Sequence, residues 1–327
     1  MPLNRRELLR TSALAGIGSL AASVPAWAQG FPTKPVTIVV PFAPGGNTDL
    51  VARLLAVSLG KVLGQPVVVD NRSGGGGAIG AVSVSRAQPD GYTLLLCGAG
   101  VIVTLPEMIK TPYNRSNFVP LALVNKSSMV LLARKNDARF KTLADLVAYA
   151  KSAEGKLNAG HSGPGTPNQL ALLQMENLLK ARFTSVSYKG SGPALVDLMG
   201  GVIDVHFDQV TSSLPHIKSG ALQPLAILGP QEDPALPGVK TVAQQGLGEI
   251  DGSTWIGVLG PAGLPPELRS QLAKALAQAV NDPQMAASAK EMGSMAYAGS
   301  PEEFSKVLEA EYKVSSTAVR EGRMKAD

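Results

Sequence analysis

Apolar residues along the chain follow two alternating patterns. Short runs of β-branched and aliphatic residues, such as Val36 to Val40 between Pro35 and Pro41, predict buried strands. Between such runs, apolar residues recur every three or four positions, as from Asn47 to Lys61, which is typical of an amphipathic helix. We further expect strands at 66–70 and 92–97 and a helix at 78–87. This alternation favours mainly parallel sheets with helices on both faces.

A second α/β series is predicted from residue 129 onward. Thr142 is a suitable N-cap for a helix that runs to about Ala153, because its hydroxyl can accept a backbone N–H bond. We expect further strands at 129–133, 157–159, 183–187, 203–207, 225–228 and 255–259, and helices at 168–180, 194–199, 212–219, 265–280, 283–292 and 301–319.

Two α/β series followed by a helical tail indicate two lobes. The chain is expected to cross between them near 124–128 and again near 223–229. Residues 29–126 and 227–327 would then form the first lobe, and residues 127–226 the second. Ligands of such sheets bind beyond the carboxyl ends of the strands, so the cleft between the lobes is the predicted binding site.

Residues 1–28 have the features of an export signal and are not expected to be part of the fold. Arg5, Arg6 and Arg10 form a basic segment ahead of an apolar stretch, and Ala26-Trp27-Ala28 fits the small-x-small cleavage rule. We therefore expect cleavage after Ala28 and a periplasmic mature protein. The paired arginines also resemble a twin-arginine signal, so the export route stays open between that pathway and ordinary secretion.

Composition narrows the function classes. With 327 residues, 17% charged, and a mean hydropathy of +0.11, the chain fits a folded protein of about two domains. A single Cys and three His argue against a disulfide framework or a metal centre, and we expect Cys97 to be buried in a strand. Removing residues 1–28, with three Arg and one Glu, lowers the net charge from +5 to +3. No long basic run remains, so the composition does not favour a nucleic-acid partner.

Four glycine-bearing loops are each predicted to follow a strand and precede a helix. They are 44–47, 74–77, 163–166 and 190–192. Glycine lets the backbone approach a ligand closely, and a helix N-terminus presents free N–H groups and positive potential. Glycine is also common in tight turns, but four such loops together favour a shared site for a carboxylate or a phosphate.

Two enzyme classes have only weak support. Gly75-x-Gly77-x-x-Gly80 formally matches a dinucleotide-binding pattern, but a lone match carries little weight, and no P-loop ending is present. The segment from Gly160 to Gly163 does not match the G-x-S-x-G motif of hydrolases, because its second glycine comes one residue early. Asp49, Asp204 and Asp208 could pair with a base, cap helices or bind water. A serine triad therefore stays open at this stage.

A series of motifs runs from Phe31 almost to the C-terminus. They are Val39–Gly46 (VVPFAPGG) with Asp49 and Ala52-Arg53, Asn71 with the glycines after it, Pro89–Leu94 (PDGYTL), Ala148–Lys151 (AYAK), Gly155–Asn158 (GKLN), Ser162-Gly163-x-Gly165-Thr166, Tyr188-Lys189-Gly190, Asp197-Leu198 with Gly200-Gly201, and Pro261-Ala262-Gly263. In their order and spacing, these motifs resemble those of the extracytoplasmic solute-binding receptors of tripartite tricarboxylate transporters, also called the Bug family.

The resemblance implies a fold, an activity and a partner. The fold is an α/β, two-lobed Venus flytrap of the type II-like periplasmic binding proteins, with mixed, mainly parallel sheets flanked by helices. The family has no catalytic activity, and we expect no cofactor or metal. Family members deliver small carboxylates, including acidic amino acids and aromatic acids, to a membrane permease. We expect a monomeric mature protein. A receptor that serves a sensor system, or a periplasmic hydrolase, remains the alternative.

In the family, loops of both lobes hold a ligand carboxylate through backbone N–H groups, hydroxyls and bridging waters. The resemblance carries this role onto two sets of residues here. The first-lobe candidates are Phe42, Ala43, Gly45, Gly46, Asn47, Asp49, Asn71 and Ala99, and the second-lobe candidates are Ser162, Gly163, Gly165, Thr166, Tyr188, Lys189 and Asp208.

Three of these candidates have more than one interpretation. Asp49 would repel an anion unless it accepts N–H bonds or water, so we expect it to cap its loop or hold a water. Lys189 could pair with a ligand carboxylate, although lysines more often lie on the surface. Phe42 is expected either to stack on the ligand or only to line the cleft.

Overall fold

The computed structural model describes residues 30–153 and 155–321. By its internal contacts the chain divides into Met1–Thr33 and Lys34–Asp327, and all described helices and strands lie in the second unit. The predicted signal peptide, residues 1–28, lies outside the described residues, so its cleavage site stays a prediction.

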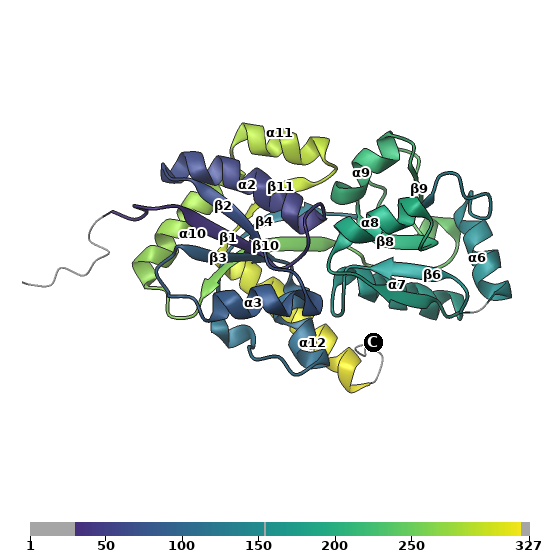
Figure 1. The fold of residues 1–327 in the computed structure, drawn as a ribbon, viewed down its shortest axis with the longest axis horizontal. Coiled ribbons are helices and arrows are strands. Elements are labelled where there is room, and N and C mark those ends of the chain that lie inside the picture. Colours follow the sequence, from purple (N-terminus) through teal and green to yellow (C-terminus); the bar gives the residue numbers. More distant parts are fainter. Residues whose placement is uncertain (1–29, 154, 322–327) are drawn as a thin grey trace, which may run out of the picture. The chain divides into compact units, whose positions relative to one another are not determined.

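The first sheet has six strands in the order β11-β4-β10-β3-β1-β2 (Figure 1). Their bounds are β1 (Val36–Val40), β2 (Val67–Asn71), β3 (Thr93–Cys97), β4 (Phe118–Ser127), β10 (Thr254–Pro261) and β11 (Met295–Gly299). Strand β1 pairs in parallel with β2 and β3, whereas β10 runs antiparallel to both β3 and β4. Helices α2 (Asn47–Leu63), α3 (Ala78–Ser85), α10 (Pro266–Val280), α11 (Pro283–Glu291) and α12 (Pro301–Arg320) accompany this sheet, with short α4 (Ala99–Ile102) and α5 (Thr104–Met108).

The second sheet has five strands in the order β7-β6-β8-β5-β9. They are β5 (Met129–Arg134), β6 (Asn158–His161), β7 (Thr184–Ser187), β8 (Val205–Gln209) and β9 (Leu222–Leu228), with helices α6 (Leu143–Ser152), α7 (Pro167–Leu179), α8 (Ser191–Gly200) and α9 (Val210–Lys218). Short 3-10 turns complete the fold: η2 (Gly75–Gly77), η3 (Arg115–Asn117) and η4 (Ala243–Gln245).

The core of the second sheet explains its continuous apolar runs. Along β5, Leu131 faces the cluster that α6 and α7 complete, whereas Val130 and Leu132 face the cluster that α8 and α9 complete. Because helices cover both faces, successive side chains of the strand are all buried. Cys97 is fully buried in β3, as the sequence predicts, and burial raises the pKa of its thiol.

Most predicted elements are confirmed with small shifts of their ends. Thr142 caps α6 in a reciprocal capping box with Asp145. The sequence-based interpretation missed β4, whose Pro120 interrupts the strand pattern, and β11, whose Met-Ala-Tyr-Ala-Gly sequence contains no β-branched residue. It also missed α4 and α5, which are too short to show helical periodicity.

Both sheets are mixed, but parallel pairs do not predominate. Among the described strands, four of the nine pairings are parallel. The antiparallel pairs arise where the chain leaves one sheet for the other. Strand β4 ends at Ser127 and β5 begins at Met129, and the chain returns between β9 and β10. The predicted lobe boundaries themselves stay a prediction.

None of the described helices is long and apolar enough to span a membrane.

Candidate functional site

A cavity of about 40 Å³ lies where loops of the first sheet meet loops of the second. Five of the predicted site residues line it: Phe42, Gly46, Asn47, Ser162 and Thr166. The other lining residues are Thr48, Gly98, Gly100, Val101, Pro167, Asn168, Gly190, Ser191, Gln209, Thr254 and Ile256. None of these lining side chains carries a charge, so any preference for a charged ligand must come from hydrogen bonds and dipoles.

Five of the described helices have their N-cap residue in the lining of this cavity, among them α4 with Gly98 and α9 with Gln209. Gly46 is the N-cap of α2, Thr166 the N-cap of α7 and Gly190 the N-cap of α8. The first N–H groups of a helix have no partner within the helix, and the aligned peptide dipoles place positive potential at that end. Since several such ends converge on a cavity without acidic side chains, the site favours an anion.

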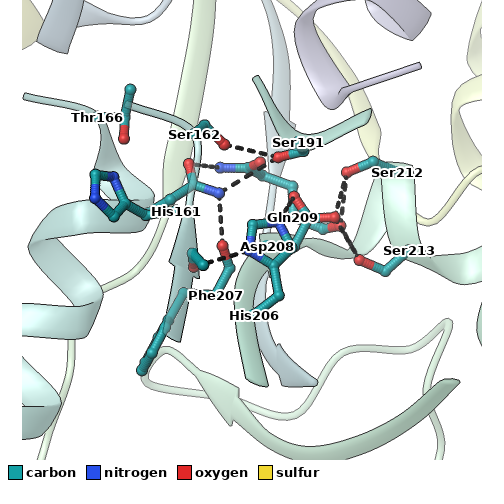
Figure 2. Close-up of polar contacts among 12 residues, drawn as sticks. His161, Ser162, Thr166, Ser191, His206, Phe207, Asp208, Gln209, Ser212 and Ser213 are labelled. Atoms are coloured by element: carbon teal, nitrogen blue, oxygen red, sulfur yellow. Dashed lines mark hydrogen bonds and ion pairs between the residues drawn. The ribbon is translucent and has the colours of Figure 1, made fainter. Parts of the chain in front are cut away.

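Buried hydroxyl and amide groups form a chain of hydrogen bonds along one side of the cavity. The hydroxyls of Ser162 and Ser191 lie 2.8 Å apart and point toward one another in Figure 2. Gln209 Nε2 donates to Asn168 Oδ1 at 3.2 Å and lies 3.4 Å from Thr254 Oγ1, which belongs to the other sheet. Hydroxyls can donate or accept as a ligand requires, so this wall can hydrogen-bond a carboxylate.

The loop from Gly163 to Thr166 is braced by its own side chains. Thr166 Oγ1 donates to the carbonyl oxygen of Gly163 at 2.7 Å and accepts the N–H of Gln169 at 3.4 Å. Gly165 N–H in turn donates to Gln169 Oε1 at 2.9 Å. The Thr166 hydroxyl therefore shapes the loop and caps α7 at the same time.

Asp49 organises the loop before α2 and does not line the cavity. Its carboxylate accepts the N–H of Gly45 at 3.0 Å, two bonds from Arg53 at 3.1 and 2.9 Å, and Asn71 Nδ2 at 2.9 Å. Burial raises the pKa of Asp49, but these donors outweigh it and hold the pKa below its ordinary value. Asn71 Nδ2 also donates to the carbonyl oxygen of Phe42 at 3.0 Å. Asp49 thus caps its loop, the role that the sequence favours for it.

Neither Lys189 nor Tyr188 is among the residues that line the cavity. Lys189 is exposed, and its carbonyl oxygen accepts the N–H of Ala43 at 2.8 Å, which joins the two halves of the site. Tyr188 donates its hydroxyl to Asp197 at 2.7 Å. Burial and the Asp197 carboxylate raise the pKa of Tyr188, so its phenol stays protonated.

The remaining predicted residues lie behind the lining. Gly163 and Gly165 pack against Gly76 and Leu105 of the other half, and Ala99 begins α4. Asp208 is fully buried and accepts hydroxyl bonds from Ser212 at 2.7 Å and Ser213 at 2.6 Å (Figure 2). Its other oxygen lies 3.7 Å from His206 Nε2. Asp208 is placed to support β8 and α9 and does not line the cavity.

Five polar lining residues are not among the predicted site residues: Thr48, which directly follows the predicted Asn47, and Asn168, Ser191, Gln209 and Thr254. Ser191 lies in the fourth glycine loop, and Asn168 is two residues after Thr166. Both could have been predicted as site residues from their position next to the glycine loops. Gln209 ends β8 and Thr254 begins β10, and the two residues are 45 positions apart in sequence. No local sequence pattern marks either side chain as part of a binding site. Only the packing of the two sheets brings them together.

Comparison with known proteins agrees with this fold. The model of the tripartite tricarboxylate transporter family receptors matches residues 51–323. Protein BugT of Bordetella pertussis is 36% identical over 267 residues, which is 80% of this chain and 82% of BugT. MatC of Rhodopseudomonas palustris, solved with bound malate, has a TM-score of 0.83 at 32% identity and covers 88% of this chain and 100% of its own. A second R. palustris protein, solved with adipate, has a TM-score of 0.86 at 29% identity, with 91% and 100% covered.

These findings define first a class of protein and then a family. The fold is that of the periplasmic binding proteins, with two mixed sheets flanked by helices. The chain belongs to the tripartite tricarboxylate transporter receptor family, as the motifs of the sequence indicate. The family is one of solute-binding receptors and not a class of enzymes.

Proposed function

We propose that the chain is an extracytoplasmic receptor that captures a small organic carboxylate for a membrane permease of the tripartite tricarboxylate type. The ligand class comprises di- and tricarboxylates, acidic amino acids and aromatic acids. The convergence of several helix N-termini on an uncharged, hydroxyl-lined cavity carries the proposal. Ligands in two similar structures, malate and adipate, are carboxylates and support it.

The ligand binds between the first turns of the helices and contacts both halves of the site. On the first side, the N–H groups at Asn47 and Thr48 are the donors that α2 leaves without a helical partner. On the second side, the hydroxyls of Ser162 and Ser191 and the N-terminus of α8 supply further donors. Phe42 lines the cavity beside them. Asp49 and Thr166 act by holding the two loops in shape.

Binding is coupled to closure of two lobes. The bond from Ala43 N–H to the carbonyl oxygen of Lys189 joins the halves, so it must break when the cavity opens to admit a ligand. A ligand that contacts both halves favours the closed form, and the permease distinguishes that form by its surface. After removal of residues 1–28, the mature protein works in the periplasm as a monomer. Residues 29–126 and 227–327 form its first lobe, and residues 127–226 form its second lobe.

Calorimetric titration of the mature chain with malate, succinate, adipate, glutamate and benzoate tests the ligand class. We expect at least one acid to bind, and to raise the melting temperature because it binds only the native state. Gly46→Val should abolish this binding, since a Cβ at Gly46 already lies 3.4 Å from Ser191 N and the added methyl groups enter the cavity. Val57→Ala, exposed on α2, is the matched control and should bind normally. Turnover of a chromogenic ester with no response to any acid would instead support a hydrolase.

The transport role is tested with the permease. Liposomes that contain the permease and the ligand-loaded receptor should take up the labelled acid, and Gly46→Val should abolish uptake. Capture of a sensor kinase together with failure of uptake would assign the receptor to signalling.

A further inference from the structure

Eight glycines line the contact between the loops of the two halves, and we call this contact the glycine seam. Its members are Gly45, Gly46, Gly76 and Gly100 on the side of the first sheet, and Gly163, Gly165, Gly190 and Gly192 on the side of the second. At most of these positions, the atoms nearest to a hypothetical Cβ belong to the backbone of the opposite half. Backbone therefore meets backbone across the cavity without side chains between.

Gly192 is the first of two positions where this contact needs glycine for space alone. It is the second residue of α8 and has an ordinary helical backbone, so alanine is compatible with its conformation. A Cβ at Gly192 would nevertheless overlap the carbonyl oxygen of Pro44, in the loop that leads into α2. Since that oxygen belongs to the backbone, an alanine here must push the two loops apart.

Gly100 makes the equivalent contact at a separate place. It is the second residue of α4, and its Cβ would lie 2.5 Å from the carbonyl oxygen of Gly165 in the loop before α7. Ordinary contact begins near 3.5 Å, so relief requires a displacement of about 1 Å. Gly100 lines the cavity, and so does Pro167 beside Gly165.

The two contacts determine how closely the helix N-termini can approach each other. Gly192 and Pro44 set the spacing of α8 from α2, and Gly100 and Gly165 set that of α4 from α7. With both in place, the cavity between these ends is only about 40 Å³. A methylene group lengthens an extended acid by about 1.3 Å, given a C–C bond of about 1.5 Å. The displacement that one Cβ demands is therefore close to one methylene.

We propose that Gly192 and Gly100 determine the length of the ligand, by fixing the distance between the two ends of the site that hold it. This inference rests on the proposed function. It goes beyond that function because it assigns length selection to glycines, which offer the ligand no side chain. The acid that fits is the shortest one that still contacts both halves when the seam is closed.

Calorimetric titration with succinate, glutarate and adipate, and with pimelate as the next longer acid after adipate, tests this assignment on the mature wild type, Gly192→Ala and Gly100→Ala. We expect each variant to bind the acid that the wild type prefers at least tenfold more weakly. The ratio of its Kd for the next longer acid to its Kd for the preferred acid should fall at least fivefold. Gly200→Ala, at the other end of α8 with no atom within 4 Å of its Cβ, is the matched control and should keep both values within twofold.

Equal weakening toward all four acids, or no change in either variant, overturns the proposal. Thermal unfolding without ligand should give both variants the melting temperature of Gly200→Ala, because in the proposed function the seam closes only when ligand binds. If one variant fails to fold, the other tests the proposal alone. If both fail to fold, the two contacts are required for folding and the proposal is overturned. If the wild type binds an acid but the ratio is unchanged, only this inference fails. Absence of binding by the wild type contradicts the proposed function itself.

Discussion

Single residues in this site act mostly through the backbone that they hold. The Asp49 carboxylate accepts bonds from Gly45, Arg53 and Asn71, and it thereby shapes the loop that ends at the N-cap of α2. Thr166 does the same for the loop before α7. The shape of both loops therefore depends on these side-chain hydrogen bonds.

Asp49→Asn should destabilise the mature protein by about 1–3 kcal/mol, because the N–H donors of Gly45 and Arg53 lose a buried, charged acceptor. Urea unfolding measures the change. Asp70→Asn removes an exposed partner of Arg72 and should change stability by less than about 0.5 kcal/mol. Equal effects of the two substitutions would contradict the role assigned to Asp49.

The contribution of Asp49 should depend on pH in one direction. The pKa of this carboxyl is lower in the folded protein than its ordinary value of 3.8. The stabilisation is therefore complete above that value and is lost as the pH falls through the folded pKa. We expect the difference in unfolding free energy between wild type and Asp49→Asn to be constant above pH 5 and to shrink below pH 3.8. A difference that grows in acid would show the opposite sign of coupling.

Thr166→Val should weaken ligand binding by about 1–3 kcal/mol, because the hydroxyl that holds the carbonyl of Gly163 is lost and the loop relaxes. The lost N-cap bond should also lower stability by about 0.5–2 kcal/mol. Thr166→Ser keeps the hydroxyl and should restore both. Calorimetry and urea unfolding separate the two effects, and normal affinity in Thr166→Val would remove this residue from the site.

At the scale of helices and strands, local sequence signals were accurate where an apolar pattern repeats without interruption, whereas the ten-residue β4, interrupted by Pro120, was missed. Val36 to Val40 and the α2 pattern were readable because burial and amphipathicity repeat over several residues. Strand β11 has five residues, none of them β-branched, and α4 has only four residues. Neither therefore shows a periodic apolar pattern. Strand β11 is positioned by its pairing with β4, and α4 is in contact with α3. Both neighbours lie elsewhere in the chain.

Thr142→Ala should lower the stability of the protein by about 1 kcal/mol, since the capping box of α6 loses the hydroxyl that accepts the Asp145 N–H. Ligand affinity should not change, because neither Thr142 nor any residue of α6 lines the cavity. Thr142→Ser is the control and should keep the stability. A loss of affinity without loss of stability would be inconsistent with a purely structural cap.

At the scale of the whole molecule, the two sheets meet through loops that carry few side chains. The Ala43 N–H is bonded to Lys189 only when the halves are in contact, whereas the N–H groups of β1 are bonded inside one sheet. Addition of the tightest-binding acid should therefore slow hydrogen exchange at the Ala43 amide at least tenfold and leave β1 unchanged. NMR-detected exchange measures both. Equal protection with and without the acid would mean that closure does not depend on ligand.

The sequence by itself determined the family, most helices and strands, and the loops that carry the glycines. These features are local or follow the order of motifs along the chain, so they need no knowledge of distant contacts. Tertiary structure alone decided that Asp49 and Asp208 lie behind the cavity wall, and that Gln209 and Thr254 lie on it. It also decided which glycines touch across the seam. Loops from two sheets meet there, and their spacing depends on the packing of both sheets, which no local pattern encodes.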